Sequence, residues 1–394
     1  MSAPTGAETG KIDHFMDILA PFSFLLTKIV PFVFVLTIVV FFHELGHFLV
    51  ARWNKVRVEA FAVGFGPELF GFHDKQGTRW KLCAIPLGGY VKFLGDQNAA
   101  SQPDPEQLEG LSADEREGAF QTKALWRRAA IVAAGPLANF ILASVIYTGL
   151  TMYFGDIRLQ PVIGKVTEAS AAEEAGFQIG DRVISINGDP IDDFQDISRY
   201  TLVGADRQLS FVVERAGEQL TIEASPRMTK RKDQFGNDFQ TGLLGIGPDQ
   251  SPEAIVRFSV GPVDAFVKSI DNIGLIISRT YHFVRELIVG KQDASQLRGP
   301  IGIGQMTSQV ATLGVLQLLS LAAALSVSIG LMNLLPVPML DGGHLMFYAV
   351  EAVRGRAMTE NAQEMAFRIG LACVLAMMLF ATFNDVGRLL GFAG

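Results

Sequence analysis

Long runs of apolar, almost uncharged residues constrain this chain more than any other feature of its sequence. Residues 21–42 contain Lys28 as their single charge, and residues 129–154 contain none. The third run covers 42 uncharged residues, 299–340, and the fourth covers residues 369–384. A helix of about 20 apolar residues crosses the hydrocarbon core of a bilayer. The runs therefore predict an α-helical polytopic membrane protein with about four transmembrane helices.

Composition excludes several other classes of protein. Only 19% of the 394 residues are charged, below the roughly 25% of an average soluble domain. The net charge of −7 argues against a nucleic-acid partner, which would need a basic surface. The two cysteines, Cys83 and Cys373, lie far apart, which excludes a disulfide framework and a cysteine zinc site. A signal peptide fits the first run poorly, because the run continues into His43 without a small-residue cleavage site.

Basic residues predict the orientation of the helices. Residues 51–95 carry seven basic and three acidic side chains. Two arginines precede the second run and two separate the third run from the fourth: Arg127, Arg128, Arg354 and Arg356. The positive-inside rule places all these segments in the cytoplasm. Residues 156–260, with 11 basic and 17 acidic side chains, then lie outside it.

Residues 155–250 predict an inserted β-rich domain. Short β-type runs at 162–166, 182–186, 209–214 and 220–224 are separated by glycine and aspartate turn signals. Residues 170–191 resemble a PDZ domain, through Ala175-Gly176, Gly180-Asp181 and Asn187-Gly188. Because PDZ domains add a peptide to a sheet edge, we expect a peptide or protein ligand. We expect one such domain, closed by a late strand around 243–247. A small β-rich domain that only spaces or plugs the membrane part is the alternative.

The end of the first run carries a candidate metal site. Residues 43–47 form an H-E-x-x-H motif. On a helix, His43 and His47 share a face and can bind one metal ion, and Glu44 can accept a proton from the attacking water. Ionisable groups at the end of an apolar helix are costly in lipid and point to function. A polar cluster between helices is the alternative. Asp341, which follows the 42-residue run, is the candidate for a third metal ligand. A helix cap is the alternative role for this residue.

The motif pair resembles a known family. H-E-x-x-H at the end of a first span, with N-x-x-P-x-P-x-L-D-G-G at residues 333–343, resembles the site-2 protease family of intramembrane zinc metalloproteases. The resemblance covers nearly the whole chain, including Gly64-Phe65-Gly66, residues 86–92, Ala134-Gly135-Pro136 and Asn139-Phe140. The PDZ insertion resembles the bacterial regulator-of-sigma-E protease type, which cleaves membrane-anchored anti-sigma factors. Some members of that branch carry two PDZ domains, whereas we expect one here.

The resemblance implies roles for particular residues. It implies Zn²⁺ bound by His43, His47 and Asp341, with Glu44 as general acid/base and Asn333 holding the substrate backbone. Residues 58–94 correspond to a membrane-dipping β-hairpin that pairs with an unwound substrate, which implies substrate binding by Gly64, Gly66, Gly88 and Gly89. His344 is not expected to be a ligand.

The resemblance also implies an activity and a place. The implied enzyme is a zinc endopeptidase in the bacterial inner membrane that cuts single-span membrane proteins after a first extracytoplasmic cut. Anti-sigma-factor-like proteins and signal-peptide remnants are the implied substrates. The active site would face the cytoplasm, and the PDZ domain the periplasm. A catalytically inactive PDZ-bearing scaffold and a metal transporter are the alternatives. An intact set of four site residues argues against a scaffold, and the lack of repeated halves argues against a transporter.

These interpretations divide the chain into nine segments. The expected segments are an N-terminal tail (1–20), transmembrane helix 1 with H-E-x-x-H (21–50), the β-hairpin region (51–95), a cytoplasmic acidic loop (96–123), transmembrane helix 2 (124–154), the periplasmic PDZ domain (155–250), an amphipathic interfacial helix (263–290), transmembrane helix 3 with the L-D-G motif (306–350) and transmembrane helix 4 (361–390).

Overall fold

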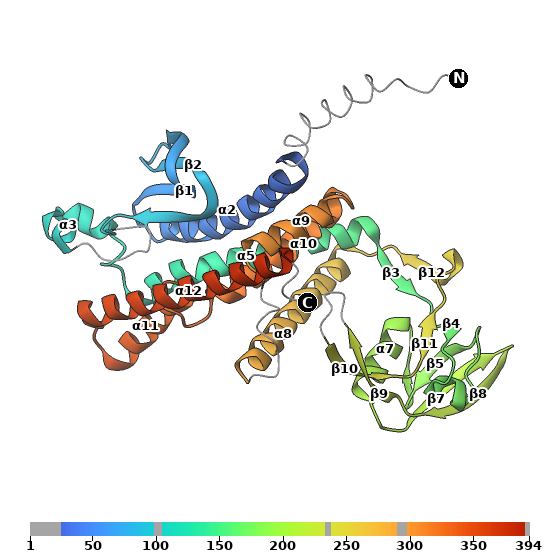
Figure 1. The fold of residues 1–394 in the computed structure, drawn as a ribbon. Coiled ribbons are helices and arrows are strands. Elements are labelled where there is room, and N and C mark those ends of the chain that lie inside the picture. The colour runs from blue at the N-terminus through green and yellow to red at the C-terminus, as the bar shows by residue number, and fades with distance from the viewer. Residues whose placement is uncertain (1–24, 98–104, 233–237, 290–297, 391–394) are drawn as a thin grey trace, which may run out of the picture. The chain divides into compact units, whose positions relative to one another are not determined.

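The chain divides into two compact units in the computed structural model, which describes residues 25–97, 105–232, 238–289 and 298–390 (Figure 1). The helical unit comprises Met1–Leu150 and Ala265–Ala393, and the β-rich unit comprises Thr151–Asp264. The expected N-terminal tail, residues 1–20, lies outside the described residues.

Within the described residues, four helices are long and apolar enough to cross a membrane, which confirms the number that the sequence predicts. The candidate spans are Thr27–Trp53, Leu125–Phe154, Val315–Asn333 and Asn361–Arg388. They belong to α2 (Val30–Trp53, preceded by the π-helical turn η1, Leu25–Ile29), α5 (Leu125–Phe154), α10 (Val315–Asn333) and α12 (Glu360–Leu389). The helix α8 (Pro262–Ile288) carries charges along its length and is not among the candidate spans.

The third apolar run is divided into separate helices. It forms α9 (Pro300–Ala311) and α10, and the helix α11 (Asp341–Arg354) follows. Gly314, the residue directly before α10, has a φ of 117°, a backbone conformation that favours glycine. Pro336 and Pro338 lie in the second gap, where proline cannot donate the hydrogen bond that a continuing helix needs. Residues 306–350, expected as transmembrane helix 3, therefore lie in three helices, and Pro336 and Pro338 are a sequence signal for the second break.

Two long strands pack against α2 (Figure 1). Strands β1 (Val58–His73) and β2 (Arg79–Phe93) pair antiparallel with several irregularities in register. Their inner face joins an aromatic core: Phe61 stacks on Trp80 with ring centroids 4.3 Å apart, and Phe48 of α2 contacts the same indole at 5.0 Å. The hairpin is thereby fixed to the helix that carries the H-E-x-x-H motif.

The expected acidic loop, residues 96–123, contains two short helices among its described residues. These are α3 (Pro105–Gly110) and α4 (Ala113–Gly118). A capping box starts α4: the Ser112 hydroxyl accepts from the Glu115 amide, and the Glu115 carboxylate accepts from the Ser112 amide. The S-x-x-E pattern is a sequence signature of a helix start, so this helix could have been predicted.

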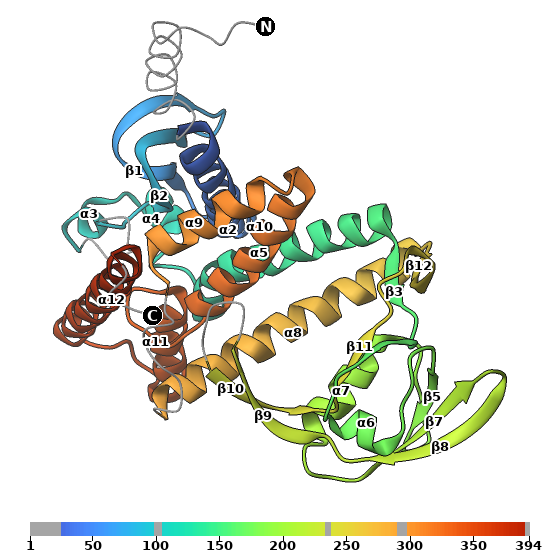
Figure 2. The ribbon, with the colours of Figure 1, turned by 45° about the vertical axis from the view of Figure 1, so that its right-hand side comes forward.

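The β-rich unit has a four-stranded sheet with the order β6-β5-β7-β8 (Figure 2). Its strands are β5 (Arg182–Ile186), β6 (Asp189–Pro190), β7 (Leu209–Arg215) and β8 (Glu218–Ala224). Three smaller pairs join β3 (Asp156–Leu159) to β12 (Ile255–Phe258), β4 (Ile163–Val166) to β11 (Ile246–Pro248), and β9 (Arg227–Lys232) to β10 (Asp238–Leu243). The unit also contains α6 (Ala171–Ala175), α7 (Phe194–Val203) and the short turn η2 (Pro252–Ala254). The four β-type runs of the sequence are thus confirmed as β4, β5, β7 and β8.

A buried ion pair holds the Gly180-Asp181 turn to strand β7. The Asp181 side chain is 0% exposed, and its two oxygens accept from Nε and Nη2 of Arg215 at 2.6 and 2.7 Å. The Gln178 amide donates to the same carboxylate at 2.8 Å. Burial would raise the pKa of Asp181, but these hydrogen bonds outweigh burial and hold the pKa below its usual value. The aspartate of this motif therefore has a structural role.

We expect Asp181→Asn to destabilise the β-rich unit by about 2 to 3 kcal/mol. Removing one partner of a buried pair costs about 3 to 5 kcal/mol, and Arg215, 26% exposed, keeps some hydration. Hydrogen exchange of β5 and β7 amides in the full chain should accelerate by about 30- to 150-fold. Because the folded-state pKa is depressed, the stabilisation is present above the unfolded pKa of about 4 and is lost as the pH falls through the folded-state pKa.

A matched control for Asp181→Asn is Arg199→Gln. Arg199 is 77% exposed and lies 3.6 Å from Asp196, and an exposed pair of this kind contributes little. Equal exchange rates in β5 and β7 of the two variants would contradict the structural role of Asp181.

Candidate active site

Helix α2 brings two imidazoles together. His43 and His47 lie four residues apart, and their Nε2 atoms are 3.3 Å from each other. Both residues are only 9% exposed. The α-helical repeat of 3.6 residues places positions i and i+4 on one face, so the local fold alone sets this pair.

Asp341 completes the cluster from the other end of the chain. It is the first residue of α11, and its Oδ2 lies 3.2 Å from His43 Nε2, while its Oδ1 lies 3.5 Å from His47 Nε2. The sharp entry into α11 depends on close backbone packing. A Cβ atom on Gly342 would lie 2.2 Å from the Leu335 carbonyl oxygen.

The three side chains fit a tetrahedral zinc ion. One ligand atom from each of His43, His47 and Asp341 lies within 4.8 Å of the others. Zinc bonds to nitrogen and oxygen are about 2.0–2.1 Å long, so tetrahedral ligand atoms lie about 3.3 Å apart. The two Nε2 atoms, 3.3 Å apart, match this value, and each lies 3.2 or 3.5 Å from a different oxygen of Asp341. In addition, the buried Oδ2 of Asp341 has no hydrogen-bond partner within the described residues besides its 3.2 Å contact with His43 Nε2, as expected of an atom that binds a cation.

Helix α5 orients the second imidazole. Nδ1 of His47 lies 2.9 Å from the Ile131 carbonyl oxygen. Because a carbonyl only accepts, Nδ1 carries the proton and Nε2 keeps its lone pair for a metal. The helices approach closely here: a Cβ atom on Gly135 would lie 2.2 Å from His47 Nε2. Any larger residue would push the ring away.

Asn139 of α5 lies against the first imidazole and is a site residue that our sequence reasoning did not assign. It is fully buried, and its Nδ2 lies 3.3 Å from His43 Nδ1, while its Oδ1 has no hydrogen-bond partner among the described residues. A neutral His43 whose Nε2 faces the cluster has its proton on Nδ1. Reversing the Asn139 amide gives this proton an acceptor and satisfies Oδ1 at the same time. A lone carboxamide in an uncharged run of 26 residues, 129–154, was the available signal.

Glu44 lies beside the cluster without belonging to it. It is 9% exposed, and no hydrogen bond or ion pair to its carboxylate is found in the part of the chain that the structure describes. Strand β2 runs next to it, because a Cβ atom on Gly89 would lie 3.0 Å from Glu44 Cγ. The carboxylate is therefore available as a base.

The other residues predicted to bind substrate fall into two groups. Asn333 lies at the end of α10 with its Nδ2 3.3 Å from His43 Nε2, so it borders the cluster. Gly64, Gly66 and Gly88 lie in the hairpin with positive φ angles. At Gly88 a Cβ atom would lie 2.7 Å from the Phe65 ring, so packing within the hairpin already requires this glycine.

A salt bridge ties α11 to α5. Arg128 Nη2 donates to Glu351 Oε1 at 2.6 Å, and the same guanidinium lies 5.0 Å from the ring centroid of Tyr348. His344, one turn from Asp341, stays outside the cluster and lies 5.3 Å from the Phe367 ring. Helix α11 is thus held so that Asp341 faces the two histidines of α2, whereas His344 does not.

Two histidines of an H-E-x-x-H helix, joined by a distant aspartate and flanked by an unpaired glutamate, define the class of metal-dependent hydrolases. Here helix α2, which carries both histidines, is also a candidate membrane span. The class is accordingly that of membrane metalloproteases.

Comparison with known proteins agrees with this class. The family model described as peptidase family M50 matches residues 31–377. A protein of Agrobacterium fabrum, named as a candidate zinc metalloprotease, is 48% identical over 374 residues, which cover 95% of this chain and 99% of that protein. Metalloprotease MmpA of Caulobacter vibrioides is 39% identical over 388 residues, covering 92% and 96%. The chain belongs to peptidase family M50, and it is a zinc metalloprotease.

Proposed function

We propose that this enzyme hydrolyses a peptide bond inside, or at the edge of, the transmembrane segment of a single-span membrane protein. The observation that carries the proposal is the cluster of His43, His47 and Asp341, whose donor atoms lie 3.2 to 3.5 Å apart. Two of the three residues belong to a candidate membrane span, Thr27–Trp53. A cut made there would lie near or within the bilayer, which supports the proposal.

The residues around the cluster have separate tasks in this proposal. His43, His47 and Asp341 would hold zinc, which would supply a Lewis acid for the scissile carbonyl and for the attacking water. Glu44 takes up the proton that the attacking water loses and delivers it to the leaving amine. Asn333, next to His43 Nε2, donates its amide hydrogens to the substrate backbone and fixes the carbonyl for attack.

The hairpin β1–β2 is proposed to receive the substrate as an extended strand. A helical substrate hides its peptide bonds in its own hydrogen bonds, so it must unwind before water can attack. Gly89 brings the backbone of β2 against Glu44, which supports pairing of a strand close to the base. Leu69, Phe70 and Phe72 are 69%, 65% and 51% exposed on the outer half of β1, as suits a hairpin that dips into lipid.

We further propose that the β-rich unit is a PDZ domain on the periplasmic side of a bacterial inner membrane, with the active site toward the cytoplasm. Within the described residues β11 pairs only with β4, which leaves its other edge for a peptide. The unit would restrict entry to substrates already trimmed outside the membrane. Membrane-anchored proteins of the anti-sigma-factor kind, and remnants of signal peptides, suit such an entrance.

Reconstitution tests this function directly. The full chain, loaded with zinc, is placed in liposomes with a single-span protein whose outer domain is short, and the fragments are mapped by mass spectrometry. We expect cuts inside or beside the apolar segment. Cuts confined to water-exposed loops would contradict intramembrane proteolysis. Stable binding of the substrate without any cut would favour the alternative of an inactive PDZ-bearing scaffold.

We expect Asn139→Ala to weaken zinc binding by about 10- to 100-fold, the usual effect of losing a residue that orients a metal-binding histidine. The proposed reason is that the Asn139 oxygen accepts the proton of His43 Nδ1. Zinc affinity is measured by competition with a chelator, so the result does not depend on activity.

Asn139→Asp distinguishes the two orientations of the amide. A carboxylate can only accept, so this variant should keep most of the zinc affinity if His43 Nδ1 donates. If Asn139 instead donates to His43, the aspartate variant should bind zinc as weakly as the alanine variant, and the proposed role of Asn139 would be wrong.

A further inference from the structure

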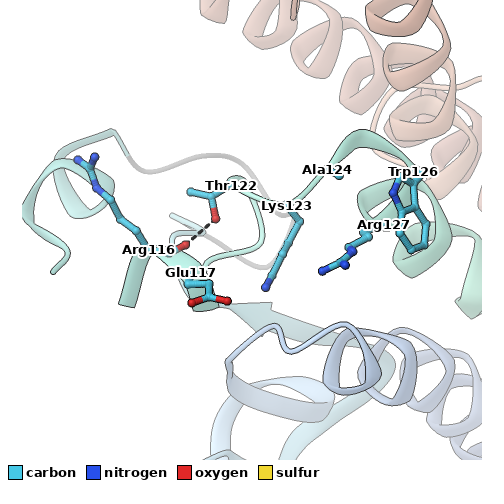
Figure 3. A pocket seen from close by; sticks show the side chains of 7 residues that line it. All are labelled: Arg116, Glu117, Thr122, Lys123, Ala124, Trp126 and Arg127. Atoms are coloured by element: carbon cyan, nitrogen blue, oxygen red, sulfur yellow. Dashed lines mark hydrogen bonds between the residues drawn. The ribbon is translucent and has the colours of Figure 1, made fainter. Parts of the chain in front are cut away.

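A basic pocket lies just before the start of helix α5, away from the residues of the metal cluster (Figure 3). It has a volume of about 520 Å³ and is lined by Arg116, Glu117, Thr122, Lys123, Ala124, Trp126 and Arg127. Three of its lining side chains are basic and one is acidic. The pocket therefore favours an anion.

Lys123 is the central residue of this pocket. It is 9% exposed, yet within the described residues its ammonium group has no hydrogen bond or ion pair. Figure 3 shows the end of the Lys123 side chain between the carboxylate of Glu117 and the guanidinium of Arg127. One acidic side chain cannot balance the three basic ones of the lining, so an anion that joins Lys123 and Arg127 would stabilise the buried ammonium group.

The electrostatics of Lys123 agree with this geometry. Burial lowers the pKa of Lys123, and the nearby charges of Arg127 and Lys55 lower it further, while Glu117 opposes them only in part. The amino end of α5, a 30-residue helix, adds the positive end of its dipole to the pocket. A phosphate group would restore the charged form of the lysine and accept hydrogen bonds from both cations.

The surroundings of the pocket indicate which kind of molecule carries the phosphate group. The candidate span Leu125–Phe154 begins two residues after Lys123. Trp126 is 65% exposed, and the Arg127 guanidinium lies 5.2 Å from the centroid of its ring. Tryptophan gathers at the boundary between water and lipid, and basic side chains beside a span attract anionic headgroups. The pocket thus lies at the depth of the phospholipid headgroups.

We propose that Lys123 and Arg127 bind the phosphate of an anionic phospholipid, with Trp126 packed against its glycerol and upper acyl chain. The bound lipid would anchor the start of α5, the helix that supplies Asn139 and the Ile131 carbonyl to the metal site. The proposal does not depend on proteolysis, because it concerns binding alone.

Native mass spectrometry of the full chain in detergent tests the proposal, with equal amounts of phosphatidylglycerol and phosphatidylcholine as probes. The wild type should prefer phosphatidylglycerol. Each of Lys123→Gln and Arg127→Gln should lower that preference about fivefold, and the double variant about 25-fold. Arg356→Gln is the matched control, since Arg356 is exposed between α11 and α12 and should leave the preference unchanged. An unchanged preference in the double variant would overturn the proposal.

A second measurement locates the lipid. Brominated phosphatidylglycerol should quench tryptophan fluorescence more in the wild type than in Trp126→Phe, and brominated phosphatidylcholine should show a smaller difference. Equal quenching of both proteins would place the lipid elsewhere and contradict the proposal.

A third measurement distinguishes a lipid headgroup from free phosphate as the source of the bound phosphate. It compares inorganic phosphate with chloride at equal ionic strength. If phosphate alone occupies the pocket and phosphatidylglycerol does not bind, the lipid assignment is wrong.

Discussion

Glu44→Gln should abolish proteolysis while leaving the zinc site filled. General acid–base catalysis contributes about 10²- to 10⁴-fold, and the carboxylate that is grouped with the two histidines in the described structure, Asp341, is assigned to the metal. We therefore expect cleavage of a single-span substrate to fall by about 10³-fold. The glutamine side chain keeps the size of the glutamate, so the packing of Gly89 against this residue should be preserved.

The measurement for Glu44→Gln pairs fragment analysis with the zinc content of the purified protein. Zinc should remain at the wild-type ratio, which separates loss of the base from loss of the metal. Glu109→Gln is the matched control, because Glu109 is exposed in α3 and its change should leave cleavage intact. If Glu44→Gln kept more than about a tenth of the activity, the assignment of Glu44 as the base would be wrong.

Asp341→Asn should remove both zinc and activity. The amide has the shape of the carboxylate but lacks its charge, and it would leave zinc with two imidazoles. Loss of a direct ligand should exceed the about 10- to 100-fold that loss of an orienting residue costs. In the wild type, added zinc should raise the melting temperature, because a ligand that binds only the folded state stabilises it. The variant should show little or no shift.

His344→Gln is the matched control for Asp341→Asn. His344 lies three residues further on in α11, outside the metal cluster, and packs near Phe367. Its variant should keep the zinc-dependent rise in melting temperature. If instead Asp341→Asn kept that rise and His344→Gln lost it, the third ligand would be the histidine and the proposed site would need revision.

Much of the fold could be predicted because its signals are local. A run of apolar residues indicates a membrane span whatever surrounds it. Residues 129–154, for example, lie within helix α5, which ends at the same residue as the run. The Asn187-Gly188 turn and its flanking strands are equally local. The helix breaks in the third apolar run were harder to predict. Two prolines indicate the gap before Asp341. Gly314 lies in a run rich in apolar residues, so it is a much weaker signal for the gap before α10.

The site shows the same division between local and distant signals. His43 and His47 share a face because any α-helix places residues four apart on one side. The roles of Gly135 and Asn139, in contrast, depend on which helix α5 packs against. Gly135 leaves room for the His47 ring, and Asn139 reaches His43. Neither contact can be read from the residues of α5.

The sequence by itself determined that this protein has four apolar spans, a β-rich insertion and a pair of histidines around a glutamate. Each of these follows from rules that act within a few residues: hydropathy, turn chemistry and the helical repeat. Only the tertiary structure decided that Asp341 lies 3.2 Å from His43 and that β2 passes beside Glu44. Those distances depend on how α2, α11 and the hairpin pack together, because a metal site needs its donors placed to within a few tenths of an ångström.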